Sequence, residues 1–295
     1  MGDDESYGME EISDEEKLTI AKHILMNSPP GQFGEMVADV KKLVPATLLD
    51  DGKLRAIARA YNQASARLIT AEGGALLVVP EEGNVDETHC LQPATGKVFK
   101  VDHIAGTATE ATNEAASTQG LLNAAIEEER KAVQSAVGEY CTSHFAEGRS
   151  ASAVYGKDQT VSVHISGEHN NLRNWWSGSW YGHYTVQVGD GKATFKGTIK
   201  VRGHYFESGN MQLQSTKAVQ EQTLSYSDAT ALGKAIGAAI KGAEESQHKT
   251  LESMYDGVSE EGLRKLRRPK PVMATKFSWN IAQIRMRNTL NSIKK

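Results

Sequence analysis

The stretch Val161-Ser-Val-His-Ile-Ser166 decides the fold class, because its apolar and polar side chains alternate with a period of two. The same alternation runs through residues 195–202. It predicts antiparallel strands that have one buried face and one polar face. Gly189-Asp-Gly191 and Ser208-Gly-Asn210 supply hairpin turns, since Gly and Asn adopt positive φ at little cost. We therefore predict an antiparallel meander over residues 148–226.

A long helix is predicted directly after this sheet. Asp228 caps it, and Leu232, Ile236 and Ile240 recur at helical spacing on a pattern that ends near Met254. We expect this helix to lie across the buried face of the sheet. Three glycines lower its helix propensity, which indicates close packing against another backbone. They are Gly233, Gly237 and Gly242.

The N-terminal part predicts a helical bundle. Ser13-Asp-Glu-Glu16 is a capping box that begins the first helix, and Asn27-Ser-Pro-Pro-Gly31 ends it. Two further amphipathic segments follow around residues 33–44 and 54–61. Three consecutive helices joined by short turns pack most simply as an antiparallel bundle.

The middle of the chain has a different texture. Residues 75–79 and 97–101 have the apolar composition of short strands, and residues 105–118 consist almost wholly of small and polar residues. We expect the latter segment to be an exposed loop that leads into a helix over residues 119–145. The predicted fold class is α+β, with these parts in order: acidic N-terminus 1–12, helical stalk 13–70, small β and loop globule 71–118, helix 119–147, antiparallel sheet 148–226, long helix 227–257, and basic C-terminal segment 258–295.

Charge is distributed unevenly along the chain. The net charge is −4, yet residues 263–295 contain ten basic residues and no acidic one, so residues 1–262 carry −14. Residues 1–16 hold eight acidic residues and no Lys or Arg. A local patch attracts a partner over roughly a Debye length of ~8 Å. An acidic target is therefore expected for the C-terminal segment.

Several function classes are disfavoured. No run of ~18 apolar residues is present to span a bilayer, and the N-terminus lacks the basic and apolar parts of a signal peptide. Cys90 and Cys141 form no CxxC, which is typical of a reduced, cytosolic protein. The segment 237–242 has the glycine spacing of a P-loop but lacks the Lys-Ser/Thr that must follow.

No catalytic residue, metal ligand or cofactor site is predicted. His164, Glu168 and His169 are close in sequence, but a strand does not converge them as a helical HExxH does. We expect them on the solvated face of the sheet. The protein is therefore expected not to be an enzyme.

The segment Asn174-Trp-Trp-Ser-Gly-Ser-Trp180 concentrates three of the four tryptophans. Such aromatics can form a stacking platform, but at the start of a strand they belong more often to a core or a subunit interface. For a subunit interface the candidates are Trp175, Trp176, Trp180 and Tyr205.

The basic C-terminal segment is followed by an amphipathic pattern. Trp279, Met286 and Leu290 fall on one stripe if this part is helical, and Pro269 and Pro271 separate it from the rest. A helix of this length is marginal alone and must dock on something. It could lie on its own protein with its charges solvated, or form a mobile arm that grips an acidic partner with an apolar cleft.

Taken together, motifs along most of the chain resemble the α subunits of the heterodimeric F-actin capping proteins. The motif His204-Tyr-Phe-Glu-Ser-Gly-Asn-Met-Gln-Leu213 is the most specific of them. The others are Lys17-Leu-Thr-Ile-Ala21, Ser28-Pro-Pro-Gly-Gln-Phe33, Asp39-Val-Lys-Lys-Leu43, Asn174-Trp-Trp-Ser-Gly-Ser-Trp180 and Leu263-Arg-Lys-Leu-Arg-Arg268.

The resemblance implies a stalk, a middle globule, and a sheet that continues into the sheet of a β subunit. It also implies a cytoplasmic, cytoskeletal protein without catalytic activity, whose C-terminal arm, called a tentacle, caps the barbed end of actin filaments. By motif position the resemblance implies that Arg264 and Arg268 bind actin and that Trp279 is the tentacle tryptophan. The neighbouring charges and the apolar stripe add Lys265, Arg267, Met286 and Leu290 as actin-binding candidates, and we expect Arg264 and Arg268 to matter more than Lys265, Arg267 and Lys270. Phosphoinositides are implied to bind Arg264, Arg268 and Trp279. A third basic position of the family falls on Ala274 here.

Other classes of function stay open. A tail that binds anionic lipid or nucleic acid needs only charge, so Leu290→Asp should then matter little. An enzyme needs a converging polar pocket, for which the sequence offers no candidate. The chain could also pair with itself, or serve in a larger assembly on an actin-related filament. We expect the capping function, with no nucleic-acid partner.

Overall fold

The computed structural model describes residues 12–111, 122–145, 147–207 and 211–257. The chain divides into two compact units, Met1–Gln247 and His248–Lys295. The described part of the second unit, residues 248–257, consists of the final turns of a helix. The stalk and both sheets described below belong to the first unit.

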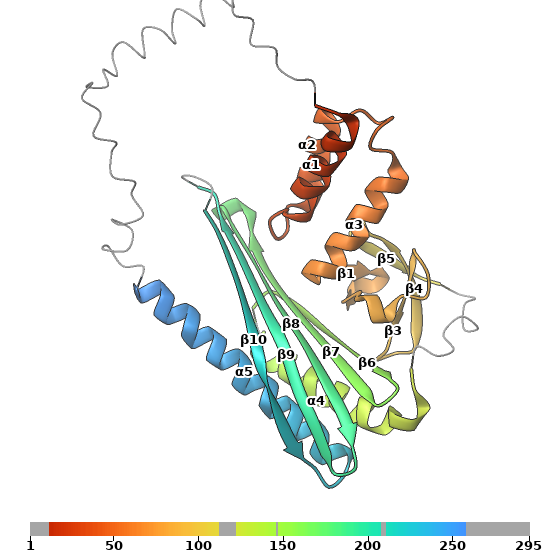
Figure 1. The fold of residues 1–295 in the computed structure, drawn as a ribbon, viewed down its shortest axis with the longest axis vertical. Coiled ribbons are helices and arrows are strands. Elements are labelled where there is room, and N and C mark those ends of the chain that lie inside the picture. The colour runs from red at the N-terminus through yellow and green to blue at the C-terminus, as the bar shows by residue number, and fades with distance from the viewer. Residues whose placement is uncertain (1–11, 112–121, 146, 208–210, 258–295) are drawn as a thin grey trace, which may run out of the picture. The chain divides into compact units, whose positions relative to one another are not determined.

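The N-terminal part is a stalk of three helices, α1 (Asp14–Met26), α2 (Phe33–Leu43) and α3 (Asp51–Ser65), drawn in red to orange in Figure 1. The predicted capping box at Ser13 and Glu16 is confirmed, with both reciprocal hydrogen bonds present. The stalk has its own apolar core, in which the rings of Phe33 and Tyr61 stack with centroids 4.4 Å apart. The predicted helical bundle is thus present.

A small mixed sheet follows the stalk. Its strands pair in the order β2-β1-β5-β4-β3, and β1 and β5 run parallel. Their bounds are β1 Ile69–Ala71, β2 Leu76–Leu77, β3 His89–Gln92, β4 Lys97–Asp102 and β5 Thr107–Glu110. The prediction of an exposed loop from residue 105 was wrong over β5, because Ala108 is buried against Val101 in this sheet. Residues 112–118 of that predicted loop lie outside the described residues.

The meander predicted over residues 148–226 is confirmed. Its five antiparallel strands lie in the order β10-β9-β8-β7-β6, and Gly191, at φ 68°, makes the predicted turn between β8 and β9. The other predicted turn lies outside the described residues, although Tyr205 and Met211 on either side of it pair. The strands are β6 Arg149–Lys157, β7 Thr160–Asn171, β8 Trp176–Gly189, β9 Lys192–Tyr205 and β10 Met211–Ser225.

One face of the meander is covered by helices α4 (Glu127–His144) and α5 (Ala229–Gly257) (Figure 1). The helix predicted from residue 119 begins later, since residues 124–126 form a single 3-10 turn first. Asp228 caps α5 as predicted, because its Oδ1 accepts from the Ala231 amide at 2.8 Å. The predicted apolar residues of α5, Leu232, Ile236 and Ile240, are fully buried.

A buried carboxyl group fixes α5 to this face. Glu244 accepts hydrogen bonds from the hydroxyls of Tyr140 on α4 and Tyr184 on β8, both at 2.8 Å. Burial raises the pKa of Glu244 above its ordinary value of 4.5. A charged or polar group in a core is tolerated when hydrogen bonds satisfy it, so this network joins three elements at one point.

The opposite face of the meander is covered where His164 and Glu168 lie, contrary to the prediction, whereas His169 and, on β9, Lys196 and Lys200 are exposed. The end of the stalk and the small sheet lie on it, with Ser166 Oγ donating to the Ala66 carbonyl at 2.6 Å and Glu168 accepting from the Leu68 amide at 2.8 Å. Burial raises the pKa of Glu168, and His164 is 2% exposed. Ser166 and Glu168 are therefore satisfied by neighbouring backbone rather than by water.

Candidate functional site

The open side of the meander is the edge strand β10. Among the described residues, β10 pairs with β9 on one side and with no strand on the other. None of its side chains is buried, and Met211 and Leu213 are 64% and 44% exposed. An unpaired edge of 15 residues presents a row of backbone donors and acceptors to a further strand. This edge is the candidate site for a partner chain.

Aromatic side chains gather at the end of the meander where β8 begins and β9 ends. Trp175 adopts a left-handed conformation at φ 63°, is 48% exposed, and meets the Phe206 ring edge-on at 5.6 Å. Tyr205 is 41% exposed and pairs across the strands with the half-buried Trp176. Three of the four residues predicted for a subunit interface therefore lie together near the first residues of β10.

The fourth predicted interface residue, Trp180, has a different environment. It is 7% exposed and lies on the helix-covered face of β8, the same face as Tyr184. Trp180 thus belongs to the core of this chain, which is the other role that the sequence left open for these tryptophans. We keep the interface hypothesis for Trp175, Trp176 and Tyr205.

The residues predicted to bind actin lie outside the described residues. They are Arg264, Lys265, Arg267, Arg268, Trp279, Met286 and Leu290, and the same holds for Ala274 and the two prolines that separate the arm. Their roles stay predictions from sequence.

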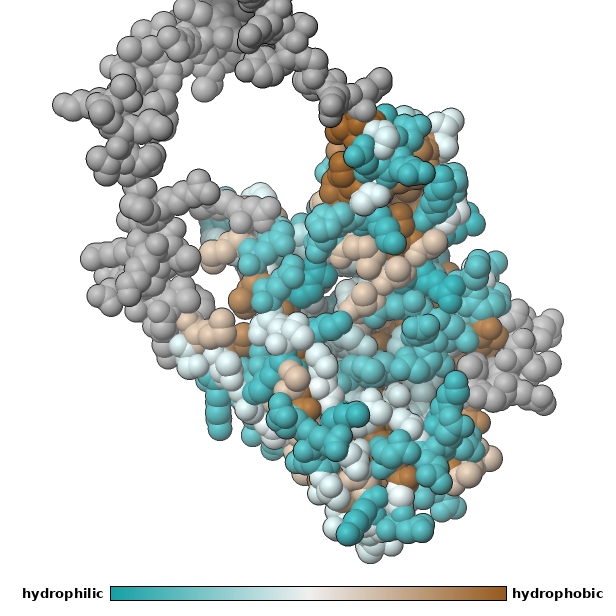
Figure 2. Space-filling model, in the orientation of Figure 1, coloured by the Kyte–Doolittle hydropathy of each residue, from teal (hydrophilic) through white to brown (hydrophobic). Residues whose placement is uncertain are grey.

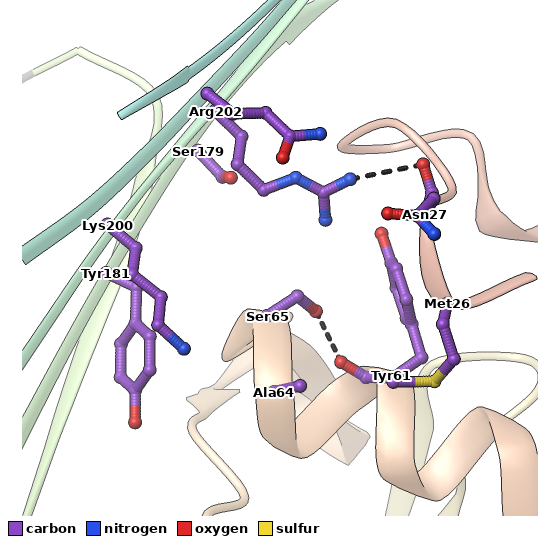
Figure 3. A pocket seen from close by; sticks show the side chains of 10 residues that line it. Met26, Asn27, Tyr61, Ala64, Ser65, Ser179, Tyr181, Lys200 and Arg202 are labelled. Carbon is purple, nitrogen blue, oxygen red and sulfur yellow. Dashed lines mark hydrogen bonds between the residues drawn. The ribbon is translucent and has the colours of Figure 1, made fainter. Parts of the chain in front are cut away.

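A cavity of about 170 Å³ lies where the stalk meets the second face of the meander (Figure 3). Lys200 and Arg202 reach into it from β9, opposite Tyr61 of α3. Arg202 donates to the Ser28 carbonyl at 2.7 Å and to the Asn27 carbonyl at 3.3 Å, just beyond the end of α1. Arg202 thus ties the turn after α1 to β9, so its first role is to dock the stalk.

The described residues hold one group of side chains suited to a metal ion. Glu82, His164 and His183 place one potential ligand atom each within 4.8 Å of the others. The sequence prediction missed this group because Glu82 is 82 residues from His164 in the chain and His183 is on the next strand. Cross-strand pairing of His164 with His183 is the signal that could have suggested it.

The exposed surface shows no large apolar area on the face seen in Figure 2, where teal and white cover most of the meander and brown gathers on the stalk. Ile20 and Leu43 on the stalk are 49% and 75% exposed. No helix among residues 12–111, 122–145, 147–207 and 211–257 is long and apolar enough to cross a membrane.

Comparison with known proteins gives a consistent result. A family profile described as F-actin capping protein alpha subunit matches residues 21–289. The F-actin-capping protein subunit alpha of Dictyostelium discoideum is 32% identical over 288 residues, which cover 95% of this chain and 99% of the relative. That of Caenorhabditis elegans is 30% identical over 281 residues, or 93% and 97% of the two chains.

The fold also has a counterpart among solved structures. The structure of the homodimeric actin capping protein alpha subunit from Plasmodium berghei superposes with a TM-score of 0.73 at 22% identity. It covers 88% of this chain and 99% of that chain. At 22% identity this likeness shows a shared fold alone.

Proposed function

The chain belongs to the family of F-actin capping protein alpha subunits, and from this premise we propose that it works as half of a dimer. Members of this family cap the barbed ends of actin filaments and are not enzymes. In this proposal a capping protein β subunit adds its sheet to β10. The observation that carries the proposal is the open edge of β10, on which no side chain is buried, beside Trp175 and Tyr205.

A β subunit bound along β10 accounts for the exposed edge better than an isolated chain does. A long edge strand with exposed apolar side chains is a hazard for aggregation unless a partner covers it. Strand addition supplies backbone hydrogen bonds for affinity, while side-chain pockets select the partner. The relative from Plasmodium berghei is described as homodimeric. Pairing of this chain with itself is therefore the alternative that the experiments have to distinguish from pairing with a β subunit.

We assign contact with actin to the C-terminal segment 258–295. The basic residues between positions 264 and 270 would attract the acidic filament and set the association rate. Trp279, Met286 and Leu290 would bury apolar surface and slow dissociation. Anionic headgroups of phosphoinositides would compete for Arg264 and Arg268 at about 1 kcal/mol per basic residue. Regulation by these lipids then needs no separate site.

The first test measures elongation of fluorescent actin seeds at their barbed ends. The complex of this chain with a β subunit should stop elongation, and deletion of residues 263–295 should weaken the apparent affinity by at least about 100-fold, since an arm of this kind holds several hot-spot residues. Equal potency of the truncated and full complexes would contradict the role of the arm.

A charge-matched pair of variants separates specific contacts from general attraction. Arg264→Ala with Arg268→Ala removes two positive charges, and so does Lys265→Ala with Lys270→Ala. We expect the arginine pair to slow association with barbed ends about tenfold more than the lysine pair. Equal effects would mean that only net charge matters. The same two variants, mixed with phosphoinositide vesicles during the assay, report whether lipid competes at the same residues.

A second matched pair tests the edge strand. Leu213→Asp places a charge on β10, whereas Ile20→Asp places one on the stalk at a similarly exposed apolar position. Light scattering of the mixture with a β subunit should show loss of the dimer for Leu213→Asp and an intact dimer for Ile20→Asp. A dimer of this chain alone that also depends on Leu213 would favour self-pairing over the β subunit.

A further inference from the structure

Two histidines and one carboxylate meet on the second face of the meander. His164 on β7 and His183 on β8 form a cross-strand pair whose rings stack at 4.5 Å and 10°. Glu82 reaches them from the short 3-10 turn Glu81–Gly83 between β2 and β3. The carboxylate thus comes from a turn between strands of the small sheet, and the imidazoles come from the meander.

The Nε2 atoms of the two imidazoles are left without hydrogen bonds. His164 Nε2 and His183 Nε2 are both buried and have no hydrogen-bond partner. The nearest carboxylate oxygens, Glu82 Oε2 and Oε1, lie 3.5 Å from His164 Nε2 and 3.8 Å from His183 Nε2. These distances exceed the 2.7–3.2 Å or so of an N–H···O hydrogen bond. A buried nitrogen without a partner costs free energy, so an unfilled position between the three groups is implied.

The two nitrogen-to-oxygen separations are close to those of ligands around a tetrahedral metal ion. Zn–N and Zn–O bonds of about 2.0–2.2 Å place neighbouring donor atoms about 3.3–3.5 Å apart. The two nitrogen-to-oxygen distances are at or slightly above this spacing. His₂Glu is a ligand set that zinc accepts, with water at the fourth position. The side chains of Glu82 and His183 are each 38% exposed, which gives the ion and a water molecule access.

The surroundings prepare the histidines for a metal. His164 Nδ1 lies 3.0 Å from the hydroxyl of Tyr181, so the tautomer in which Nδ1–H donates to that oxygen leaves the Nε2 lone pair free.

Glu82 is also held in place by its own turn. The Asn84 amide donates to the Glu81 carbonyl at 3.1 Å, and Asn84 Oδ1 accepts from Gln63 of α3 at 3.2 Å. Gly83 packs so closely on Tyr155 of β6 that a side chain there would collide with it. The carboxylate is therefore presented by a fixed segment rather than by a free loop.

We propose that Glu82, His164 and His183 form a binding site for a divalent transition metal ion of the zinc class, with water as the fourth ligand. Binding requires the stacked imidazoles to tilt toward a common point, and the half-exposed His183 has room for this rotation. The ion would join the small mixed sheet to the meander. The positive charge of Lys200, the other charged group near His183, repels the metal ion. The variant Lys200→Met should therefore bind the ion more tightly than the natural chain does.

Titration with Zn²⁺ alone tests the proposal. The full chain, in its complex with a β subunit if the dimer forms, is stripped with a chelator and titrated against a chromophoric zinc competitor. We expect one Zn²⁺ per chain, and a loss of affinity of at least about tenfold in His183→Gln and in Glu82→Gln. The control His23→Gln, at an exposed position on α1, should bind as the natural chain does. Co²⁺ in place of Zn²⁺ should give the visible absorption of a tetrahedral site.

Folding of the variants is checked by circular dichroism, and thermal unfolding gives a second readout. Zn²⁺ should raise the Tm of the natural chain and of His23→Gln but not that of His183→Gln. If His183→Gln fails to fold, Glu82→Gln decides, because its side chain lies on the surface turn. No stoichiometric binding, or equal binding by the natural chain and Glu82→Gln, would overturn the proposal.

Discussion

Substitution of two glycines in the same helix gives a sharp test of how α5 packs. A Cβ added at Gly233 would lie 2.6 Å from the Ala132 carbonyl oxygen of α4 and 2.9 Å from its carbonyl carbon. A Cβ added at Gly242 would have nothing within 4 Å. Both changes to alanine gain the same helix propensity, so Gly242→Ala is a matched control for Gly233→Ala.

The expected magnitudes follow from these contacts. Gly→Ala in a helix interior gains up to about 1 kcal/mol, so Gly242→Ala should stabilise the protein by roughly 0.5–1 kcal/mol. At Gly233 the added methyl meets backbone, which cannot rotate away, and overpacking of this kind costs about 1–3 kcal/mol. The propensity term cancels between the variants, so Gly233→Ala should be about 1–3 kcal/mol less stable than Gly242→Ala.

Urea unfolding followed by circular dichroism measures this difference. The m-values of the two variants have to agree, so that the change in midpoint reports stability rather than a different denatured state. Gly237→Ala should be stabilised at least as much as Gly242→Ala, since its added Cβ would meet the Ala136 methyl at an ordinary van der Waals distance of 3.7 Å. Equal stabilisation by Gly233→Ala and Gly242→Ala would refute the close approach of α4 and α5.

Two further predictions concern buried charged groups. Arg130→Ala should lower the free energy of unfolding in urea by about 2–3 kcal/mol, because it breaks hydrogen bonds to Glu127 and to the Val154 carbonyl. This loss is smaller than for a fully buried ion pair, since the Glu127 side chain is 28% exposed. Lys131→Ala, which removes a 69% exposed partner of the same carboxylate, should change stability by less than ~0.5 kcal/mol. Burial raises the pKa of Glu244 above 4.5, so its protonated form contributes stability that is present at low pH and lost as pH rises through the raised pKa. Relative to Glu244→Gln, the natural chain should therefore lose stability as pH increases; a constant difference across pH would contradict this.

The sequence predicted the elements that are long enough to show their period. Strands of 12 to 15 residues such as β7 and β9 display alternation over several repeats, and one buried face is enough to fix their register. The close approach at Gly233 could also be anticipated, because glycine in a helix interior needs a reason. Propensity alone did not distinguish Gly233 from Gly242, since the difference lies in what α4 places opposite each of them.

The small sheet could not be predicted as a whole. Its strands are two to six residues long, and β1 pairs in parallel with β5 across more than thirty intervening residues. Segments this short carry no measurable period, and the Ala and Thr of β5 are equally common in loops. The metal-ligand group depends on this sheet, because Glu82 is brought to His164 by packing between two sheets.

Alternation also cannot say what covers the polar face of a sheet. On the second face of the meander, Ser166 and Glu168 have the composition of a solvated surface, yet each bonds to backbone of residues 66–68. A polar side chain that meets backbone donors and acceptors is as well satisfied as one in water. Sequence patterns therefore predicted the two faces correctly but not their environments.

The distribution of burial across the meander restricts where a second chain can bind. In the central strands β7 and β8 both faces are occupied within this chain, by α4 and α5 on one side and by the stalk and the small sheet on the other, as the burial of the adjacent residues Val163 and His164 illustrates. On β10 no side chain reaches burial. Over β7 and β8 a partner cannot stack on a face that is already covered, so we expect a second chain to approach the meander from the β10 side. We therefore expect substitutions on the faces to change folding, and substitutions on β10 to change dimer formation while the isolated chain keeps its secondary structure.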